Sequence, residues 1–391
     1  MFAQISASRP DTPICAFASG HLPHTILSSC QGTLLSMFST TTVLPLRVTC
    51  KEANDSVKRH PWSDEKIIKG KISSWRRCFP KALAANINFM DSSVNRRRSP
   101  VTNADFVHFR GIQKLNMSGC KNITDAAFVH LRGIKELHMD WCPLITDDAC
   151  VYLQGIKILT ASMTSITDAA FENFRGIQYL DINESKLIRD TGFAYLGGIK
   201  TLYMKKCVHV TDAAFVHLGG IQLLDVYGCN YITDTAISYL SGIQSLDISF
   251  CRNITDAAFV HLTGIKSLRI NGCYRVTDAA FKHLHGIKTL DMIHCNQQTI
   301  TDAAFQHLRG IQQLKMEWCN QSTITDAAFQ HLRGIQDLDM SMCDQRTITY
   351  VFLQHLGGIR DLIMRGCNSL LIKEAIRLRL TKDYFYREYW K

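Results

Sequence analysis

Apolar and polar positions along residues 101–370 follow one text, I-T-D-A-A-F-x-H-L-x-G-I-x-x-L-x-M-x-x-C, written again and again. The copies begin at Val101, Ile123, Ile145, Ile166, Ile188, Val210, Ile232, Ile254, Val276, Ile300, Ile324 and Ile348. Most are 22 residues long, one is 21, and those starting at Val276, Ile300 and Ile324 are 24. A fixed period of this length predicts a solenoid, in which each repeat packs only on its neighbours.

Each part of the repeated text predicts a structural element. The Thr-Asp pair is typical of a helix N-cap, because its side-chain oxygens can accept from the free N–H groups of the first turn. Phe and Leu three residues apart predict a short helix with one apolar face, and the following Gly predicts its left-handed end. Leu and Met two apart predict a short strand with both side chains on one side. We therefore expect the α/β class, a parallel sheet with helices outside it.

The stretches "LDMSMCDQRTIT" and "LDISFCRNITD" resemble the cysteine-containing leucine-rich repeats, whose text is L-x-L-x-x-C-x-x-I-T-D. The resemblance implies that the strands line the concave face of a curved solenoid and the short helices its convex face. It also implies that each Cys bonds the loop backbone of its turn. Thr164 and Ser185 replace the Cys in two repeats, and as small polar groups we expect them to continue the column.

Ten of the fifteen cysteines, from Cys120 to Cys367, occupy this one repeat position. Identical sites in a stacked array cannot pair with their neighbours without distorting the sheet, so we expect free thiols and a reducing compartment. The expected location is therefore cytoplasmic or nuclear, or the host cytoplasm if the chain is viral. The spacing fits no zinc motif and no catalytic set stands out, so we expect no metal, no cofactor and no enzyme activity.

A second column, on the predicted helices, is mostly histidine. It holds His108, His130, His217, His261, His283, His307, His331 and His355, with Tyr152, Tyr195, Tyr239 and Asn173 in the other repeats. Tyrosine substitutes poorly for histidine as a metal ligand. The pattern therefore favours a stacking column over a metal or pH-sensing site.

The positions beside the inward Leu and Met differ from copy to copy, and we expect them to face a protein partner. The predicted partner-binding residues are His138, Asp140, Trp141, Tyr203, Lys205, Tyr227, Phe250, Arg269, Lys315, Glu317, Trp318 and Arg365. Equivalent positions hold Lys206, Asp225, Asp247, Asn271, Asp291, Ile293, His294, Asp339 and Met342. Aromatic residues among charges are typical of protein interfaces. Drift at unconstrained exposed sites is the alternative, but it would favour small polar residues.

Residues 21–62, ahead of the repeats, resemble an F-box, a three-helix module that binds the adaptor of cullin–RING ubiquitin ligases. The resemblance rests on Leu22-Pro23, an apolar pair with Phe38, Cys50-Lys51 and a late Trp62. It implies that the chain is a substrate-recognition subunit of such a ligase. The implied adaptor-binding residues are Leu22, Pro23, Ile26, Leu27, Leu34, Met37 and Phe38. The alternatives are a degenerate helical cap and a repeat scaffold without a ubiquitin role.

The sequence divides into five expected parts. They are a disordered segment at 1–20, the F-box-like helical module at 21–64, a linker and N-terminal cap at 65–100, twelve repeats at 101–370, and a C-terminal cap and tail at 371–391. Residues 1–100 have a net charge of +8 and the remainder +2, within a total of +10. The repeats thus lack the broad basic stripe of a nucleic-acid surface. No apolar run is long enough to predict a membrane span.

Overall fold

A computed structural model describes residues 55, 57–63, 67, 68, 70–88 and 101–380. The chain divides into two compact units, residues 1–160 and 161–391, and each is described by itself. The predicted adaptor-binding residues lie outside the described residues.

The N-terminal unit includes the parallel strands β1–β4 and several short helices. Its elements are α6 (Ile72–Cys78), β1 (Ala84–Asn86), η3 (Asn103–Phe109), β2 (Lys114–Asn116), η4 (Asp125–Leu131), β3 (Glu136–His138), α7 (Asp147–Cys150) and β4 (Ile158–Thr160), where η marks a 3₁₀ helix. The strands pair in chain order, β1 with β2, β2 with β3 and β3 with β4.

The C-terminal unit continues the same alternation of helix and strand. Its elements are η5 (Asp168–Phe174), β5 (Tyr179–Asp181), η6 (Asp190–Tyr195), β6 (Thr201–Tyr203), η7 (Asp212–His217), β7 (Leu223–Asp225), α8 (Asp234–Ser238), β8 (Ser245–Asp247), η8 (Asp256–Leu262), β9 (Ser267–Arg269), α9 (Asp278–Phe281), β10 (Thr289–Asp291), α10 (Asp302–Phe305), η9 (Gln306–Leu308), β11 (Gln313–Lys315), α11 (Asp326–Phe329), η10 (Gln330–Leu332), β12 (Asp337–Asp339), η11 (Tyr350–His355), β13 (Asp361–Ile363) and α12 (Ser369–Arg377).

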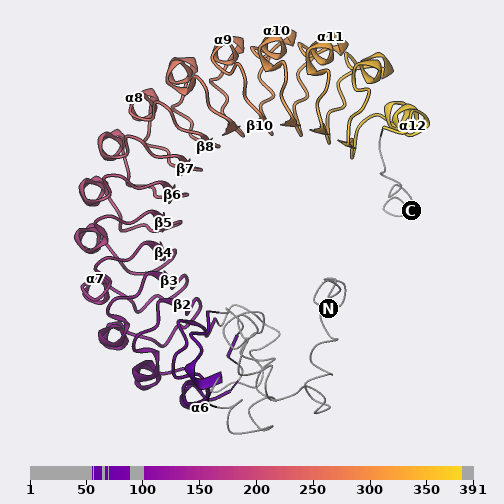
Figure 1. The fold of residues 1–391 in the computed structure, drawn as a ribbon. Helices are drawn as coiled ribbons and strands as arrows, with labels where there is room; N and C mark the ends of the chain where they lie inside the picture. The colour runs from indigo at the N-terminus through magenta and orange to yellow at the C-terminus, as the bar shows by residue number, and fades with distance from the viewer. Residues whose placement is uncertain (1–54, 56, 64–66, 69, 89–100, 381–391) are drawn as a thin grey trace, which may run out of the picture. The chain divides into compact units, whose positions relative to one another are not determined.

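Within this unit the strands β5–β13 line the concave side of an arc and the helices its convex side (Figure 1). Every strand runs parallel to the next in sequence, in the same register, so that Leu224 lies beside Leu246 and Leu246 beside Leu268. The prediction of an α/β solenoid with a parallel sheet is confirmed.

The core of each repeat lies between its strand and its helix. Leu246 in β8 and Ile248 directly after it are buried, and the helix that follows contributes Ala258 and Phe259, both with no exposed surface. Side chains alternate across a strand, so the residues beside Leu246 point the other way, to the open face of the sheet. We call this open side of the strands, with the turn residues up to the Cys, the strand face.

The Thr-Asp pair before most helices of the C-terminal unit makes two kinds of hydrogen bond, of which the sequence analysis predicted only the helix cap. Thr255 caps its helix, because its hydroxyl oxygen accepts from the N–H of Ala257 at 3.3 Å. The neighbouring Asp256 does not cap. Its carboxylate accepts from the backbone N–H of Thr277, at 2.7 Å, and from the Thr277 hydroxyl, at 2.6 Å, in the next repeat. The expectation that both residues cap was therefore wrong for the Asp, which ties successive repeats together.

The helical segments are mostly short 3₁₀ turns and end where the sequence predicted. Gly264, for example, follows η8 with φ of +88°, in the left-handed region that a residue without Cβ adopts most easily. The histidine column lies on this side. Arg175 lies over the ring of Tyr195 at 4.6 Å, and the rings of His285 and His307 meet edge to face at 4.9 Å. Tyr195 and His307 belong to the column, whereas Arg175 and His285 stand directly before the helix-ending glycine of the preceding repeat. The column thus contacts a second column, and stacking among its own members stays a prediction.

The longer repeats accommodate their two extra residues by burying a glutamine. The amide of Gln297 donates to the carbonyl oxygens of Cys273, at 3.1 Å, and Val276, at 2.8 Å. Gln321 has no exposed surface and donates to the carbonyl oxygen of Cys295 at 3.0 Å. The wider loop is thus held in place by a side chain together with a backbone bond, in which the carbonyl of Thr299 accepts from the N–H of Asp278 at 3.1 Å.

Candidate functional site

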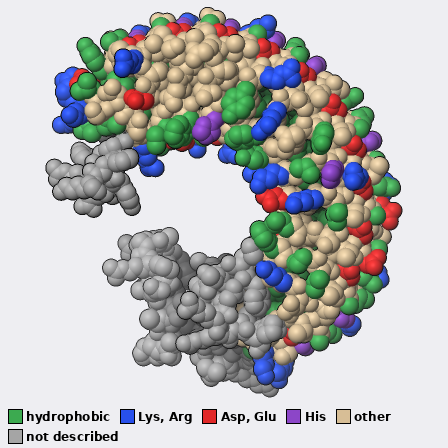
Figure 2. All heavy atoms as spheres, turned by 180° about the vertical axis from the view of Figure 1, so that it is seen from behind, with side chains coloured by type: hydrophobic (Ala, Val, Ile, Leu, Met, Phe, Trp, Pro, Cys, Tyr) green, Lys and Arg blue, Asp and Glu red, His purple; other side chains and the backbone are tan. Residues whose placement is uncertain are grey.

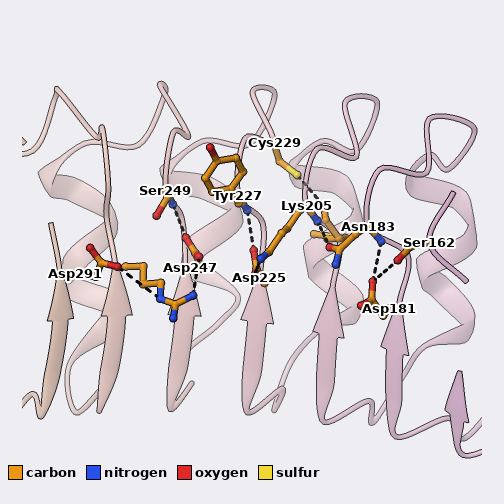
Figure 3. Close-up of polar contacts among 12 residues, drawn as sticks. Ser162, Asp181, Asn183, Lys205, Asp225, Tyr227, Cys229, Asp247, Ser249 and Asp291 are labelled. Carbon is orange, nitrogen blue, oxygen red and sulfur yellow. Dashed lines mark hydrogen bonds and ion pairs between the residues drawn. The ribbon is translucent and has the colours of Figure 1, made fainter. Parts of the chain in front are cut away.

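The cysteine column is a ladder of thiol hydrogen bonds that holds the edge of the strand face. The Cys229 thiol donates to the carbonyl oxygen of Met204 in the preceding repeat at 3.2 Å (Figure 3), and the Cys251 thiol donates to the carbonyl oxygen of Val226 at the same distance. Every described cysteine is free, and all except Cys78 are buried. Burial raises the pKa of Cys229 to about 12, so the thiols stay protonated and donate. The predicted free, structural thiols are confirmed for the described residues.

The column is interrupted where serine and threonine replace cysteine, against expectation. The Thr164 hydroxyl donates to the carbonyl of Ala161 within its own turn, at 2.8 Å. The Ser185 hydroxyl is buried and has no hydrogen-bond partner among the residues that the structure describes. A hydroxyl oxygen is held closer to its backbone than a thiol sulfur, so these side chains do not make the bond that the cysteines make.

The acidic residues at the ends of the strands shape the turn that follows. The Asp225 carboxylate accepts from the N–H of Tyr227 at 3.1 Å, and Asp247 accepts from the N–H of Ser249 at 2.9 Å (Figure 3). Such a bond from an Asp side chain to the backbone two residues on is a local turn motif. The carboxylates of this column are therefore largely occupied by the fold.

Several of the predicted partner-binding cations are also occupied. Lys205 Nζ lies 3.1 Å from the Asp225 carboxylate, and Arg269 lies between Asp247 and Asp291, at 3.6 and 3.9 Å (Figure 3). Burial raises the pKa of Asp225, and the negative charge of Asp247 on the neighbouring strand raises it further. Lys205 therefore offsets local repulsion on the strand face, and only part of its charge is available to a partner.

In the N-terminal unit the predicted residues His138 and Asp140 also make internal contacts. The His138 ring lies 2.9 Å from the Glu136 carboxylate, and the Thr160 hydroxyl donates to Asp140 at 2.5 Å. Trp141, by contrast, keeps 44% of its surface exposed. The tryptophan is thus the side chain of this group that a partner could cover.

The residue before each cysteine of the column adopts a left-handed backbone, which the sequence analysis missed. It is glycine in four repeats, at Gly119, Gly228, Gly272 and Gly366. Elsewhere it is bulky, at Trp141, Lys206, Phe250, His294, Trp318 and Met342, with φ between 54° and 61°. A left-handed conformation costs a residue with a Cβ about 1–2 kcal/mol. The alternation of glycine with large residues in one column was the sequence signal that could have revealed it.

The large residues of this column pack along the strand face. The rings of Tyr227 and Phe250 lie 5.1 Å apart, and Trp318 stacks on His294 at 5.8 Å. A Cβ on Gly272 would lie 2.7 Å from the Phe250 ring, so Phe250 extends over the neighbouring repeat. Trp318 still exposes 43% of its surface and Met342 38%. These side chains are fixed in place and yet open to solvent.

All twelve predicted partner-binding residues lie on strand-face positions, although their binding role stays a prediction. Arg269, Lys315, Trp318 and Arg365 are exposed, and Tyr203 and Glu317 are half-buried. Hydrophobic side chains on the surface are separated by charged ones instead of forming one apolar patch (Figure 2). Among the described residues, no group of three or more His, Cys, Asp or Glu could hold a metal ion. No helix in the described ranges has the length and apolarity to span a membrane.

Comparison with known proteins identifies the repeat type. The family description "BspA type leucine rich repeat region" matches six copies, over residues 145–266 and 230–355, together more than half of the chain. No curated protein matches the sequence. Leucine-rich repeat proteins are generally scaffolds suited to protein–protein interaction, and no catalytic family is indicated.

Solved structures share the fold at low sequence identity. The mouse RP105/MD-1 complex contains a chain 17% identical, with a TM-score of 0.56, covering 80% of this chain and 56% of that one. A chain of the Drosophila Toll–Spatzle complex is 13% identical, with a TM-score of 0.52, and the match covers 77% of this chain and 49% of that one. A chain of the yeast Rad7–Elc1 complex is 14% identical, with a TM-score of 0.49, and the match covers 69% of this chain and 81% of that one. The present chain spans about half the length of the first two.

At such identities the similarity to solved structures shows the fold alone. The family match, by contrast, covers repeats that are recognisable in the sequence and whose strands pair in one register. The chain therefore belongs to the BspA type leucine-rich repeat family.

Proposed function

We propose that this chain binds a partner protein on its strand face. The observation that carries the proposal is the set of bulky residues held in a left-handed backbone, Trp141, Phe250, His294, Trp318 and Met342. Four other repeats place glycine there at no conformational cost. Strain of this kind persists where the surrounding structure enforces it and is concentrated at functional sites.

The side chains at these positions suit a protein interface. Exposed Trp318 and half-buried Phe250 are large, and their neighbours His294 and Tyr227 hold them in place. Aromatic anchors that are already ordered lose little entropy on binding and dominate interface energies. The charges around them, on Lys315, Glu317 and Arg365, would form the polar rim.

A double variant, Phe250→Ala with Trp318→Ala, tests the proposal. Val216→Ala with Val260→Ala is the matched control, because both valines are exposed on the helix side. We expect proteins captured from cells by the wild type and by the control to be lost from the strand-face variant. Identical captured proteins from all three would contradict a role for the strand face.

The finer proposal is that the chain is a substrate-recognition subunit of a cullin–RING ubiquitin ligase. Its support is the resemblance of residues 21–62 to an F-box, ahead of an array that can hold a target. The free thiols in the array agree with a location in the cytoplasm or nucleus, where cysteines are kept reduced. A repeat scaffold with no ubiquitin role is the second candidate, supported by the same array.

Binding of the purified ligase adaptor to the full chain separates the two candidates. Buried apolar anchors each contribute about 2 kcal/mol or more at an interface. Leu22→Ala with Pro23→Ala should therefore weaken adaptor binding by roughly tenfold or more, while the strand-face variant Phe250→Ala with Trp318→Ala should leave it unchanged. If the wild type retains no adaptor at micromolar concentration, the ligase proposal fails and the plain scaffold remains.

A further inference from the structure

Most carboxylates on the strand face of the C-terminal unit have a basic partner. Glu184 pairs with Lys206 at 3.0 Å, and Asp225 with Lys205 at 3.1 Å. Asp247 and Asp291 share Arg269, and Asp337 pairs with Arg360 at 2.5 Å. The fold thus neutralises these acidic groups internally, which leaves little for a partner to gain from them.

Glu317, in the turn after β11, and Asp339, at the end of the neighbouring strand β12, are exceptions. Neither makes an ion pair with any residue that the structure describes, although Lys315, at the end of β11, lies near enough for its charge to lower the pKa of Glu317. The Asp339 carboxylate accepts from the backbone N–H of Ser341 at 3.0 Å and from its hydroxyl at 2.7 Å, both neutral donors. Partial burial raises the pKa of Glu317, and the negative charge of Asp339 raises it further.

Exposed apolar side chains follow these carboxylates closely along the chain. Trp318 follows Glu317 directly, stacks on His294 and exposes 43% of its surface. Met342 follows the Asp339 turn in the next repeat and exposes 38%. An indole face next to two carboxylates is a favourable environment for a cation, which gains from both the ring and the charges.

Building on the proposed function, we infer that the strand face of β10–β12 binds a cationic segment of the partner protein. An arginine or lysine of that segment lies against Trp318 and pairs with Glu317 and Asp339, and an adjacent apolar residue covers Met342. The cation supplies the neutralising charge that each other acidic residue named above receives from within the chain. The remaining repeats contribute contacts without this charge requirement.

Fluorescence anisotropy with a labelled peptide tests this inference on the full chain. The probe is Gly-Ser-Arg-Leu-Arg-Leu-Gly-Ser, compared with versions that replace both arginines by Lys, Gln or Glu. We expect the Arg peptide, the Lys peptide or both to bind. Comparing these two peptides shows whether the site prefers a guanidinium or an ammonium group. The Gln and Glu peptides should bind roughly tenfold more weakly or not at all. Equal binding of all four peptides, or binding of none, would overturn the inference.

Isosteric variants locate the binding. Glu317→Gln with Asp339→Asn should weaken the Arg peptide by roughly tenfold. Glu172→Gln with Asp344→Asn, which removes the same two charges from exposed positions off the strand face, should change it by about twofold or less. Equal losses in both variants would show long-range charge attraction only and overturn the inference.

The proposed function fails separately from this inference. If Phe250→Ala with Trp318→Ala releases captured partner proteins while Glu317→Gln with Asp339→Asn releases none, the strand face binds a partner and only the cationic chemistry is wrong. If neither variant releases a partner, the proposed function itself is wrong.

Discussion

Gly272 and Gly264 offer a matched test of how the large residues occupy the strand face. Both glycines have a left-handed backbone, with φ of +64° and +88°. A Cβ at position 264 would meet nothing within 4 Å, whereas at position 272 it would lie 2.7 Å from the ring of Phe250. The ring cannot simply withdraw, because Tyr227 packs on it at 5.1 Å. Gly264→Ala therefore measures backbone strain alone, and Gly272→Ala measures strain together with overpacking.

The expected magnitudes follow from these two contributions. Gly264→Ala should lower the free energy of unfolding by about 1 kcal/mol. Gly272→Ala should lower it by about 1–3 kcal/mol more, the usual cost of inserting a methyl group into a packed site. The gain from a less flexible unfolded chain is similar for both substitutions and cancels in the comparison.

Urea denaturation followed by circular dichroism gives the two values, provided that the slope with denaturant stays constant. In a Phe250→Ala background the excess cost of Gly272→Ala should vanish to within about 0.5 kcal/mol, because the ring is gone. If Gly272→Ala costs no more than Gly264→Ala, or the excess survives without Phe250, then Phe250 does not lie over the next repeat as described.

Three further predictions concern the scaffold. Leu246→Ala removes buried side-chain volume beside two neighbouring strands and should lower the free energy of unfolding by about 2–5 kcal/mol, measured by thermal or urea unfolding. His261→Gln, on the helix side, should lower it far less. If His261→Gln cost more than Leu246→Ala, the assignment of the buried and exposed sides would be wrong. Thiol titration of the denatured, unreduced protein should find nearly all fifteen cysteines reactive, and several protected pairs would contradict free thiols. Burial raises the pKa of Cys229 and Cys295 in the folded protein to about 12 each, so unfolding releases thiol protons at alkaline pH. The free energy of unfolding should therefore be at its full value below the ordinary thiol pKa and fall as the pH rises towards 12. A urea midpoint that stays constant from about pH 8 to 11 would refute the thiol ladder.

The fold could be predicted well from the sequence because every repeat places apolar and polar residues at the same positions. Leu246 and Phe259 each belong to a column that is apolar in every copy, so the buried side of strand and helix follows directly. The cysteines were predicted as free from their placement alone. The secondary structure and the buried side of a single repeat could thus largely be predicted from its sequence.

Contacts between repeats were harder to predict, because they depend on distances across the sheet. The text Thr-Asp could not show that Asp256 reaches Thr277 in the next repeat instead of its own helix. It could not show that Lys205 and Arg269 pair with neighbouring strands. Neighbouring strands lie about 5 Å apart, so every strand-face charge has candidate partners on both sides, and only coordinates select one.

The gap in the thiol ladder at Thr164 and Ser185 gives the array a direction of unfolding. A repeat array is a chain of nearest-neighbour couplings, and a weak coupling divides it into separately melting blocks. Ser185 leaves its hydroxyl unbonded, whereas Cys207 and every cysteine of the column after it donate to the preceding repeat. The C-terminal unit should therefore open first around residues 164–187, with amides there exchanging early. The turns that hold Tyr227, Phe250 and Trp318 would remain folded as a block, so this part of the proposed binding surface outlasts the loss of the repeats before it.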